Sequence, residues 1–288
     1  MPRIDPAWLD RMYNNRALVP EHGAHFARWA ADSAAARASQ PCTLDIAYGS
    51  GAGETLDVFA PTNGGPAGGA PVLVFIHGGY WRALDKADHS FIAPAFTAQG
   101  ACVVVPNYAL CPAVSIPDIT LQMVRALAWV ARNIHAFGGD PARIVVAGHS
   151  AGGHLAAMLL LCRWRELGRD LPAGLVRRAL SVSGVFDLAP LRHTPFVKDD
   201  LRLTPAQVAK ASPARLPAPR TGTLAAVVGG DESPEFIRQN RLIRDAWGPR
   251  AVPVCEELPG RNHFSALEAL VEPGHRLHAL ALGMLQER

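Results

Sequence analysis

The segment Gly148-His149-Ser150-Ala151-Gly152 has the pattern G-x-S-x-G, whose serine hydroxyl can act as a nucleophile. The apolar run 144–147 comes directly before it, and a strongly helical stretch, 151–166, comes directly after it. A serine at such a strand-to-helix turn has strained backbone angles and needs small neighbours on both sides. The helix N-terminus would place backbone N–H groups near the reacting oxygen. We therefore expect Ser150 to attack a carbonyl carbon and to form an acyl-enzyme.

A second glycine-containing loop, His77-Gly78-Gly79-Tyr80-Trp81, ends an earlier apolar run. A loop in this place can donate backbone N–H groups to the negatively charged oxygen of a tetrahedral intermediate. The expected donors are Gly78, Gly79 or Tyr80, together with Ala151, the residue after the nucleophile. We expect His77 to anchor the loop and not to carry protons.

A serine nucleophile needs a base, and the order expected on such a fold is serine, then an acid, then histidine. His263 lies in a loop between the strand-like residues 253–258 and the helical residues 265–286. His275 and His278 fall inside that helical stretch. His263 is therefore the expected base.

The acid that orients the base should lie at the carboxyl end of a strand. Asp231 follows the apolar run 224–230 directly, and a helix follows it, so Asp231 is the expected acid. Glu232, the next residue, and Asp187, at the end of the preceding run, are the alternatives.

The elements that would carry these residues alternate between strands and helices. Most strand-like runs are continuously apolar, which predicts a mostly parallel central sheet with helices on both faces. Two alternating runs, 42–48 and 55–60, predict an antiparallel hairpin at a sheet edge. The buried strands are expected at 71–79, 101–108, 143–150, 179–187, 224–231 and 253–260, and the helices at 86–99, 117–137, 151–166, 234–247 and 265–286.

One proline-rich segment, residues 188–220, interrupts this alternation. We expect it to form a small cap over the strand ends, joined by the N-terminal helical segment 1–40. The Gly- and Pro-rich stretch 61–71 is too short to be a domain linker, so residues 1–288 are expected to form a single domain.

Composition excludes several classes of protein. The net charge is only +3 and the basic residues are scattered, so no nucleic-acid partner is expected. No apolar stretch reaches the length of a membrane span, and no secretory signal is visible. The five cysteines include no C-x-x-C pair, which favours free thiols in the cytoplasm. No metal-ligand spacing occurs, no cofactor is expected, and no pattern indicates an oligomeric state.

Four motifs together resemble the α/β-hydrolase superfamily, and within it the esterase/lipase branch that includes the kynurenine formamidases, or arylformamidases. They are HGGYW at 77–81, GHSAGGH at 148–154, GGDES at 229–233 and NHF at 262–264. The resemblance extends from about residue 42 to the C-terminus. It implies an α/β-hydrolase fold without a cofactor, with Ser150, Asp231 and His263 as nucleophile, acid and base. The chain departs from hormone-sensitive-lipase-like esterases at Tyr80, where their HGGG loop has a third glycine.

Aromatic residues near these motifs indicate the kind of substrate. Trp81, Phe186, Phe196 and Phe264 are expected to line the pocket beside Tyr80, which would suit a small aromatic or apolar group. Arg82 and Arg192 are candidate partners for a substrate carboxylate. The expected activity is hydrolysis of a small carboxylic ester or amide. An arylformamidase acting on N-formylkynurenine is the alternative, and a non-catalytic binding module on the same fold is the alternative of another class.

Overall fold

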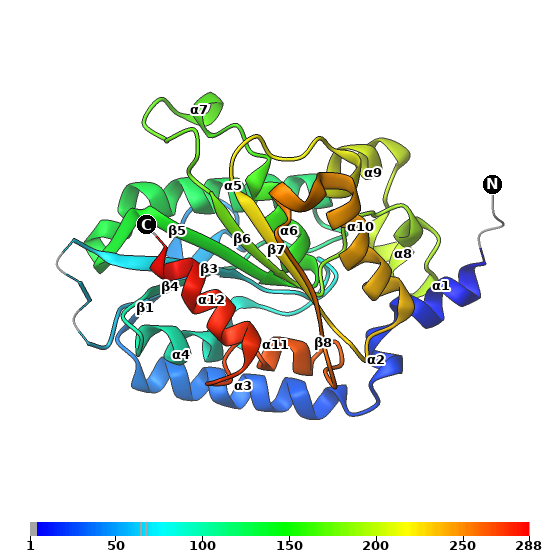
Figure 1. The fold of residues 1–288 in the computed structure, drawn as a ribbon, viewed down its shortest axis with the longest axis horizontal. Coiled ribbons are helices and arrows are strands. Elements are labelled where there is room, and N and C mark those ends of the chain that lie inside the picture. The colour runs from blue at the N-terminus through cyan, green and yellow to red at the C-terminus, as the bar shows by residue number, and fades with distance from the viewer. Residues whose placement is uncertain (1–4, 64, 67, 288) are drawn as a thin grey trace.

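The computed structural model describes residues 5–63, 65, 66 and 68–287, and is built around one eight-stranded sheet of order β1-β2-β4-β3-β5-β6-β7-β8 (Figure 1). Strand β2 is antiparallel to both β1 and β4, and every other pair is parallel. The mostly parallel sheet and the edge hairpin are therefore confirmed. The strands are β1 (Cys42–Ala47), β2 (Thr55–Phe59), β3 (Ala70–Ile76), β4 (Cys102–Pro106), β5 (Gly139–His149), β6 (Arg178–Val182), β7 (Thr223–Gly229) and β8 (Val254–Leu258).

Helices cover both faces of this sheet, as the continuously apolar strands require (Figure 1). One face carries α5, α6 and α10, and the opposite face carries α4, α11 and α12. The helices are α1 (Pro6–Tyr13), α2 (Asn15–Leu18), α3 (His22–Ser39), α4 (Ala93–Thr97), α5 (Ile116–Asn133), α6 (Ala151–Leu160), α7 (Trp164–Leu167), α8 (Pro195–Leu201), α9 (Pro205–Ala211), α10 (Pro234–Ala251), α11 (Ser265–Glu268) and α12 (Arg276–Gln286).

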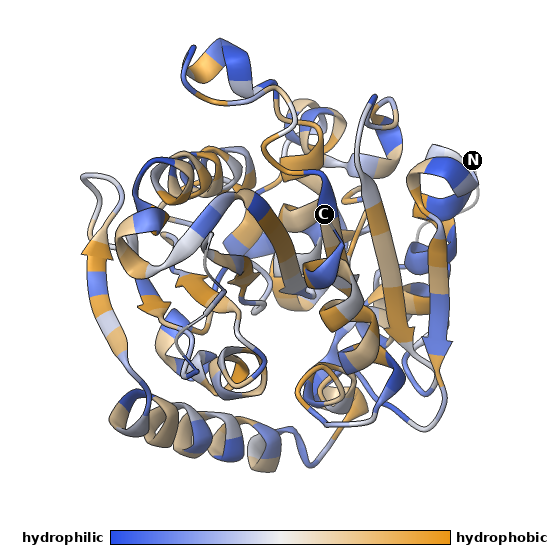
Figure 2. Cartoon of the chain, turned by 60° about the vertical axis from the view of Figure 1, so that its left-hand side comes forward, coloured by the Kyte–Doolittle hydropathy of each residue, from blue (hydrophilic) through white to orange (hydrophobic). Residues whose placement is uncertain are grey.

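The core consists of two apolar layers, one on each side of the sheet. In β4 all five residues are buried, and in β3 six of seven are. Figure 2 shows the central strands coloured mostly as hydrophobic, whereas the helices around them alternate between hydrophobic and hydrophilic residues. Among the described residues, no helix combines the length and the apolar character needed to cross a membrane.

Helix α1 and residues 188–220 lie against each other, whereas α3 packs against the 3₁₀ turns of residues 86–92. The segment 188–220 forms α8, α9 and short 3₁₀ turns. The backbone N–H of Phe196 in α8 donates to Asp10 Oδ1 of α1 at 3.0 Å. The Tyr80 hydroxyl donates to the Tyr13 carbonyl at 2.7 Å, so α1 is also tied to the loop after β3.

Three expected helices are broken, and one of them, 151–166, divides into α6 and α7. Residues 86–99 contain two 3₁₀ turns, and α4 begins only at Ala93, where Pro94 favours a helix start. The stretch 265–286 divides into α11 and α12, because Pro273 removes an N–H donor and Gly274 adopts a φ of 83°.

Candidate active site

The backbone of Ser150 is strained at the turn between β5 and α6. Its φ is 54° and its ψ is −115°, a combination that non-glycine residues rarely adopt. Its two glycine neighbours have no room for a side chain. A Cβ on Gly148 would collide with the backbone of Gly152, and one on Gly152 would collide with the carbonyl of Ile76. The G-x-S-x-G pattern therefore has a steric reason, and the structure has the sharp turn that it predicts.

Ser150 and His263 line the same cavity. His263 follows β8 in the loop before α11 and is almost completely buried. Its Nδ1 atom lies 2.6 Å from Oε2 of Glu232, which leaves Nε2 as the ring nitrogen without a hydrogen bond among the described residues. The ring of His149 packs 4.7 Å from that of His263, and its Nε2 contacts the His263 carbonyl at 2.8 Å.

The carboxylate of Glu232 is held on both oxygens. Its Oε1 accepts the backbone N–H of Gly229 at 2.8 Å and a short hydrogen bond from the Ser183 hydroxyl. Its side chain has no exposed surface. These bonds fix the direction in which the second oxygen faces the imidazole, as an orienting acid requires.

The structure corrects the expected position of the acid. Asp231 is exposed, and only its backbone bonds to the neighbouring loop, through an N–H donated to Arg261 at 3.1 Å. Asp187, the other alternative, is paired with Arg215 at 2.9 Å. In the turn after β7 the side chain of Glu232, not that of Asp231, enters the protein. The expectation for Asp231 is therefore wrong, and the alternative residue Glu232 occupies the place.

The loop after β3 presents free backbone donors beside Ser150. Within the part of the chain that the structure describes, the N–H groups of Gly78, Gly79, Tyr80 and Ala151 have no intramolecular acceptor. Gly79 has a φ of 102°, and a Cβ on it would collide with the Ala83 carbonyl. Gly79 and Tyr80 also line the cavity with Ser150. This arrangement fits an oxyanion hole.

His77 holds this loop in place, as its sequence position indicated. Its Nδ1 lies 2.8 Å from the Gly78 carbonyl and its Nε2 lies 3.0 Å from Asn107 Oδ1. Its ring stacks on Tyr108, with the two centroids 4.2 Å apart. Complete burial lowers the pKa of His77, which keeps the ring neutral and suits a structural role.

Two of the four aromatic residues expected in the pocket do line it, namely Phe196 and Phe264. The other two are core residues. Trp81 is fully buried edge-on against His154, with the ring centroids 4.9 Å apart, and Phe186 is fully buried in the core. Sequence reasoning missed the contribution of α2 and α3, which supply Asn15, Arg16, Phe26 and Trp29. The apolar residues of the N-terminal segment can be recognised in the sequence, but no sequence pattern indicates that they line the pocket.

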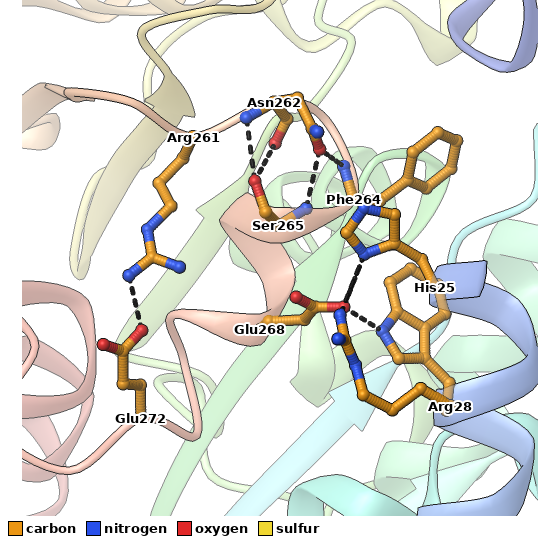
Figure 3. A network of polar contacts seen from close by, with 9 residues as sticks. His25, Arg28, Arg261, Asn262, Phe264, Ser265, Glu268 and Glu272 are labelled. Carbon is orange, nitrogen blue, oxygen red and sulfur yellow. Dashed lines mark hydrogen bonds and ion pairs between the residues drawn. The ribbon is translucent and has the colours of Figure 1, made fainter. Parts of the chain in front are cut away.

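Helix α3 also fastens the loop that carries His263 (Figure 3). Glu268 of α11 accepts hydrogen bonds from His25 Nδ1 at 2.6 Å and from Trp29 Nε1 at 3.0 Å, and it pairs with Arg28. Figure 3 shows the side chains of His25 and Arg28 from α3 converging on Glu268. We call this group the Glu268 cluster.

The same loop is fixed from within by the turn at Asn262. Asn262 Oδ1 accepts the N–H groups of Phe264 at 3.0 Å and Ser265 at 2.9 Å (Figure 3). His263 is therefore held between this turn and the Glu268 cluster.

No group of three or more metal-ligating side chains occurs among the residues that the structure places. The five cysteines are free thiols, and burial raises the pKa of Cys102 to about 12.

The same fold and motifs occur in known hydrolases. The BD-FAE family model matches residues 56–195. Kynurenine formamidase of Danio rerio is 30% identical over 268 residues, which cover 91% of this chain and 88% of that protein. The corresponding enzyme of Salmo salar is 30% identical over 259 residues, covering 87% and 84%. The chain belongs to the kynurenine formamidase family of α/β-hydrolases.

Solved structures agree with this assignment. A candidate thioesterase from Silicibacter sp. TM1040 is 31% identical, with a TM-score of 0.81 over 94% of this chain and 97% of that one. Esterase B from Lactobacillus rhamnosis is 19% identical with a TM-score of 0.70, over 96% and 95%, and so shows the shared fold. The chain is a hydrolytic enzyme that acts on esters or amides, as the sequence predicted.

Proposed function

We propose that this enzyme cleaves the formamide bond of small aromatic N-formyl amines, with N-formylkynurenine as the leading substrate. The observation that carries the proposal is the wall of the cavity above Ser150. Four aromatic side chains line the same cavity as the nucleophile and suit a flat aromatic group. They are Phe26, Trp29, Phe196 and Phe264. The kynurenine formamidases of two fishes, similar over most of their length, support the same bond type.

The first half of the proposed reaction forms a formyl-enzyme. The imidazole of His263 takes the proton of Ser150 as the hydroxyl oxygen bonds to the formyl carbon. The carbonyl oxygen becomes an oxyanion, which the free N–H groups of Gly79 and Ala151 stabilise. His263 then gives its proton to the amine nitrogen, the carbon–nitrogen bond breaks, and the arylamine leaves.

The second half releases formate. A water molecule transfers a proton to His263 and its oxygen bonds to the formyl carbon of the ester on Ser150. Collapse of this intermediate breaks the ester, returns the proton to the serine oxygen and frees formic acid. Glu232 keeps Nδ1 of His263 protonated and stabilises the imidazolium through both steps.

The test compares kcat/KM for N-formylkynurenine, an aryl acetate and an acyl thioester with the purified enzyme. We expect N-formylkynurenine to give the highest value, and the Ser150→Ala variant to lose turnover of all three by at least about 10³-fold. Full activity in Ser150→Ala would remove the nucleophile. A thioester or aryl acetate exceeding N-formylkynurenine would favour the second candidate, an esterase, for which the structural similarity to the Silicibacter protein argues.

We further propose that the enzyme works in the cytoplasm. Its five free thiols support a reducing compartment. Fractionation of the source cells with a tagged full-length chain tests this location.

A further inference from the structure

We propose that Arg16 and Asn15 of α2 form a carboxylate-binding subsite of the catalytic pocket, which selects substrates whose aromatic leaving group carries a carboxylate. The proposal deepens the proposed function and rests on Ser150 as the nucleophile of this pocket.

The first observation is a cation that lacks a carboxylate partner. Arg16 lines the same cavity as Ser150, with its guanidinium carbon 5.4 Å from the centroid of the Phe26 ring. It forms no ion pair with any carboxylate that the structure describes. Arg82 lines the cavity too, but it is paired with Asp200 and lies over Phe196 at 5.1 Å. Both guanidinium groups therefore line the pocket, and of the two only that of Arg82 is paired with a described carboxylate.

Electrostatics makes the pocket attractive to an anion. Partial burial and the charge of Arg82 lower the pKa of Arg16, although a guanidinium stays protonated at neutral pH. The same two causes favour a bound negative charge, because it would offset both the lost hydration and the repulsion between the arginines.

The second observation is a buried amide beside that cation. Asn15 is 5% exposed, lines the cavity, and has an Nδ2 donor without an acceptor among the described residues. A buried donor of this kind is costly unless a ligand or a water accepts from it. A carboxylate bound to Arg16 offers a second oxygen for such a donor.

The combination favours a carboxylate over a more highly charged anion. One guanidinium and one amide match the single charge and two planar oxygens of a carboxylate. Aromatic side chains then receive the ring of the substrate between this subsite and Ser150. The substrate class is therefore an aromatic acyl amide or ester with a carboxylate on its leaving group.

The test uses two aryl esters that differ in one group, 4-acetoxybenzoate and 4-acetoxybenzamide. Their kcat/KM values are divided by their rates of hydroxide hydrolysis, which removes the difference in leaving-group chemistry. We expect the wild-type enzyme to prefer the carboxylate, and Arg16→Gln to lower the preference by about tenfold or more. Arg16→Lys should keep part of it, and Asn15→Asp should reverse it by placing a negative charge at the subsite.

The matched control is Arg11→Gln, which removes one exposed positive charge from the neighbouring helix α1, outside the cavity. It should leave both esters unaffected. An equal preference in the wild type, or an unchanged preference in Arg16→Gln, would overturn the subsite. Thermal melting of each variant identifies misfolding; if Asn15→Asp unfolds, the Gln and Lys variants of Arg16 still decide the outcome.

The two proposals fail in different ways. If the ester pair shows the arginine-dependent preference and N-formylkynurenine is not cleaved, the subsite holds and the formamidase proposal falls. If N-formylkynurenine is cleaved and the preference is absent, the formamidase proposal holds and the subsite falls.

Discussion

The imidazole of His263 and the carboxylate of Glu232 are joined by a 2.6 Å contact between Nδ1 and Oε2, and both side chains are almost completely buried. The two residues come from the loops after β8 and β7. Their pairing makes the identity of the acid testable, because the neighbouring Asp231 carries the same charge on the outside of the same turn.

We expect Glu232→Gln to lower kcat by about 10³-fold or more, because the amide cannot stabilise the imidazolium that forms during catalysis. Steady-state kinetics with an aryl acetate measures the effect. Asp231→Asn is the matched control, and it should stay within about twofold of the wild type because an exposed charge contributes little. An Asp231→Asn variant that is the more damaged of the two would reassign the acid.

The acidic limb of the pH–rate profile should not depend on the rings of His149 and His154. His149 also lines the pocket, but burial and the neighbouring His263 lower its pKa well below the ordinary value, and burial lowers the pKa of His154 to about 4. These two rings therefore stay neutral in the mildly acidic range. We expect His149→Gln to leave the midpoint of the acidic limb of kcat/KM within about half a pH unit. A larger displacement would show that His149 titrates with the reaction.

Glu268→Gln should destabilise the enzyme at neutral pH. Burial raises the pKa of Glu268, but the hydrogen bonds from His25 and Arg28 outweigh it, so the net shift is downward. A carboxylate with a lowered pKa contributes stability above its unfolded pKa and loses that contribution as the pH falls through its folded value. We expect a loss of about 1–2 kcal/mol at pH 7 in urea unfolding, and a smaller difference from the wild type below about pH 4.

The control for the Glu268 cluster is Glu166→Gln in α7, which breaks an exposed ion pair with Arg163, the residue before this helix. Its effect should stay below about 0.5 kcal/mol. Equal losses for the two variants at pH 7 would contradict a structural role for the Glu268 cluster.

Gly148→Ala should destabilise the enzyme, because its Cβ would collide with the backbone of Gly152 at the start of α6. We expect a loss of about 1–3 kcal/mol or more by chemical denaturation, together with loss of hydrolysis. Gly283→Ala is the matched substitution, since nothing lies within 4 Å of its Cβ in α12. There the gain in helix propensity should stabilise the enzyme by about 0.5–1 kcal/mol. Similar behaviour of the two variants would contradict the steric argument.

Much of the fold was predictable because it depends on repeated local patterns. The continuously apolar runs correspond to β3 through β8, and the alternating pair corresponds to the β1–β2 hairpin. The nucleophile turn was also predictable, since Gly148, Ser150 and Gly152 are adjacent in the chain and the strain depends on their own backbone angles.

The acid was not predictable to the residue. Asp231 and Glu232 occupy the same turn, and which side chain enters the protein depends on hydrogen bonds to distant residues. The backbone of Asp231 bonds to Arg261, and the carboxylate of Glu232 to Ser183. The pocket wall was not predictable for the same reason. Trp29 lies in it because α3 packs beside the site, and no local sequence pattern predicts that packing.

Because α2 and α3 supply part of the pocket wall from a stretch of chain that precedes every strand, this part of the wall is encoded apart from the reacting groups. Exchange of the first forty residues between relatives should therefore alter substrate preference while the reacting groups after the strands are retained. Such chimaeras offer a route to new selectivity in this scaffold without redesign of its reacting groups.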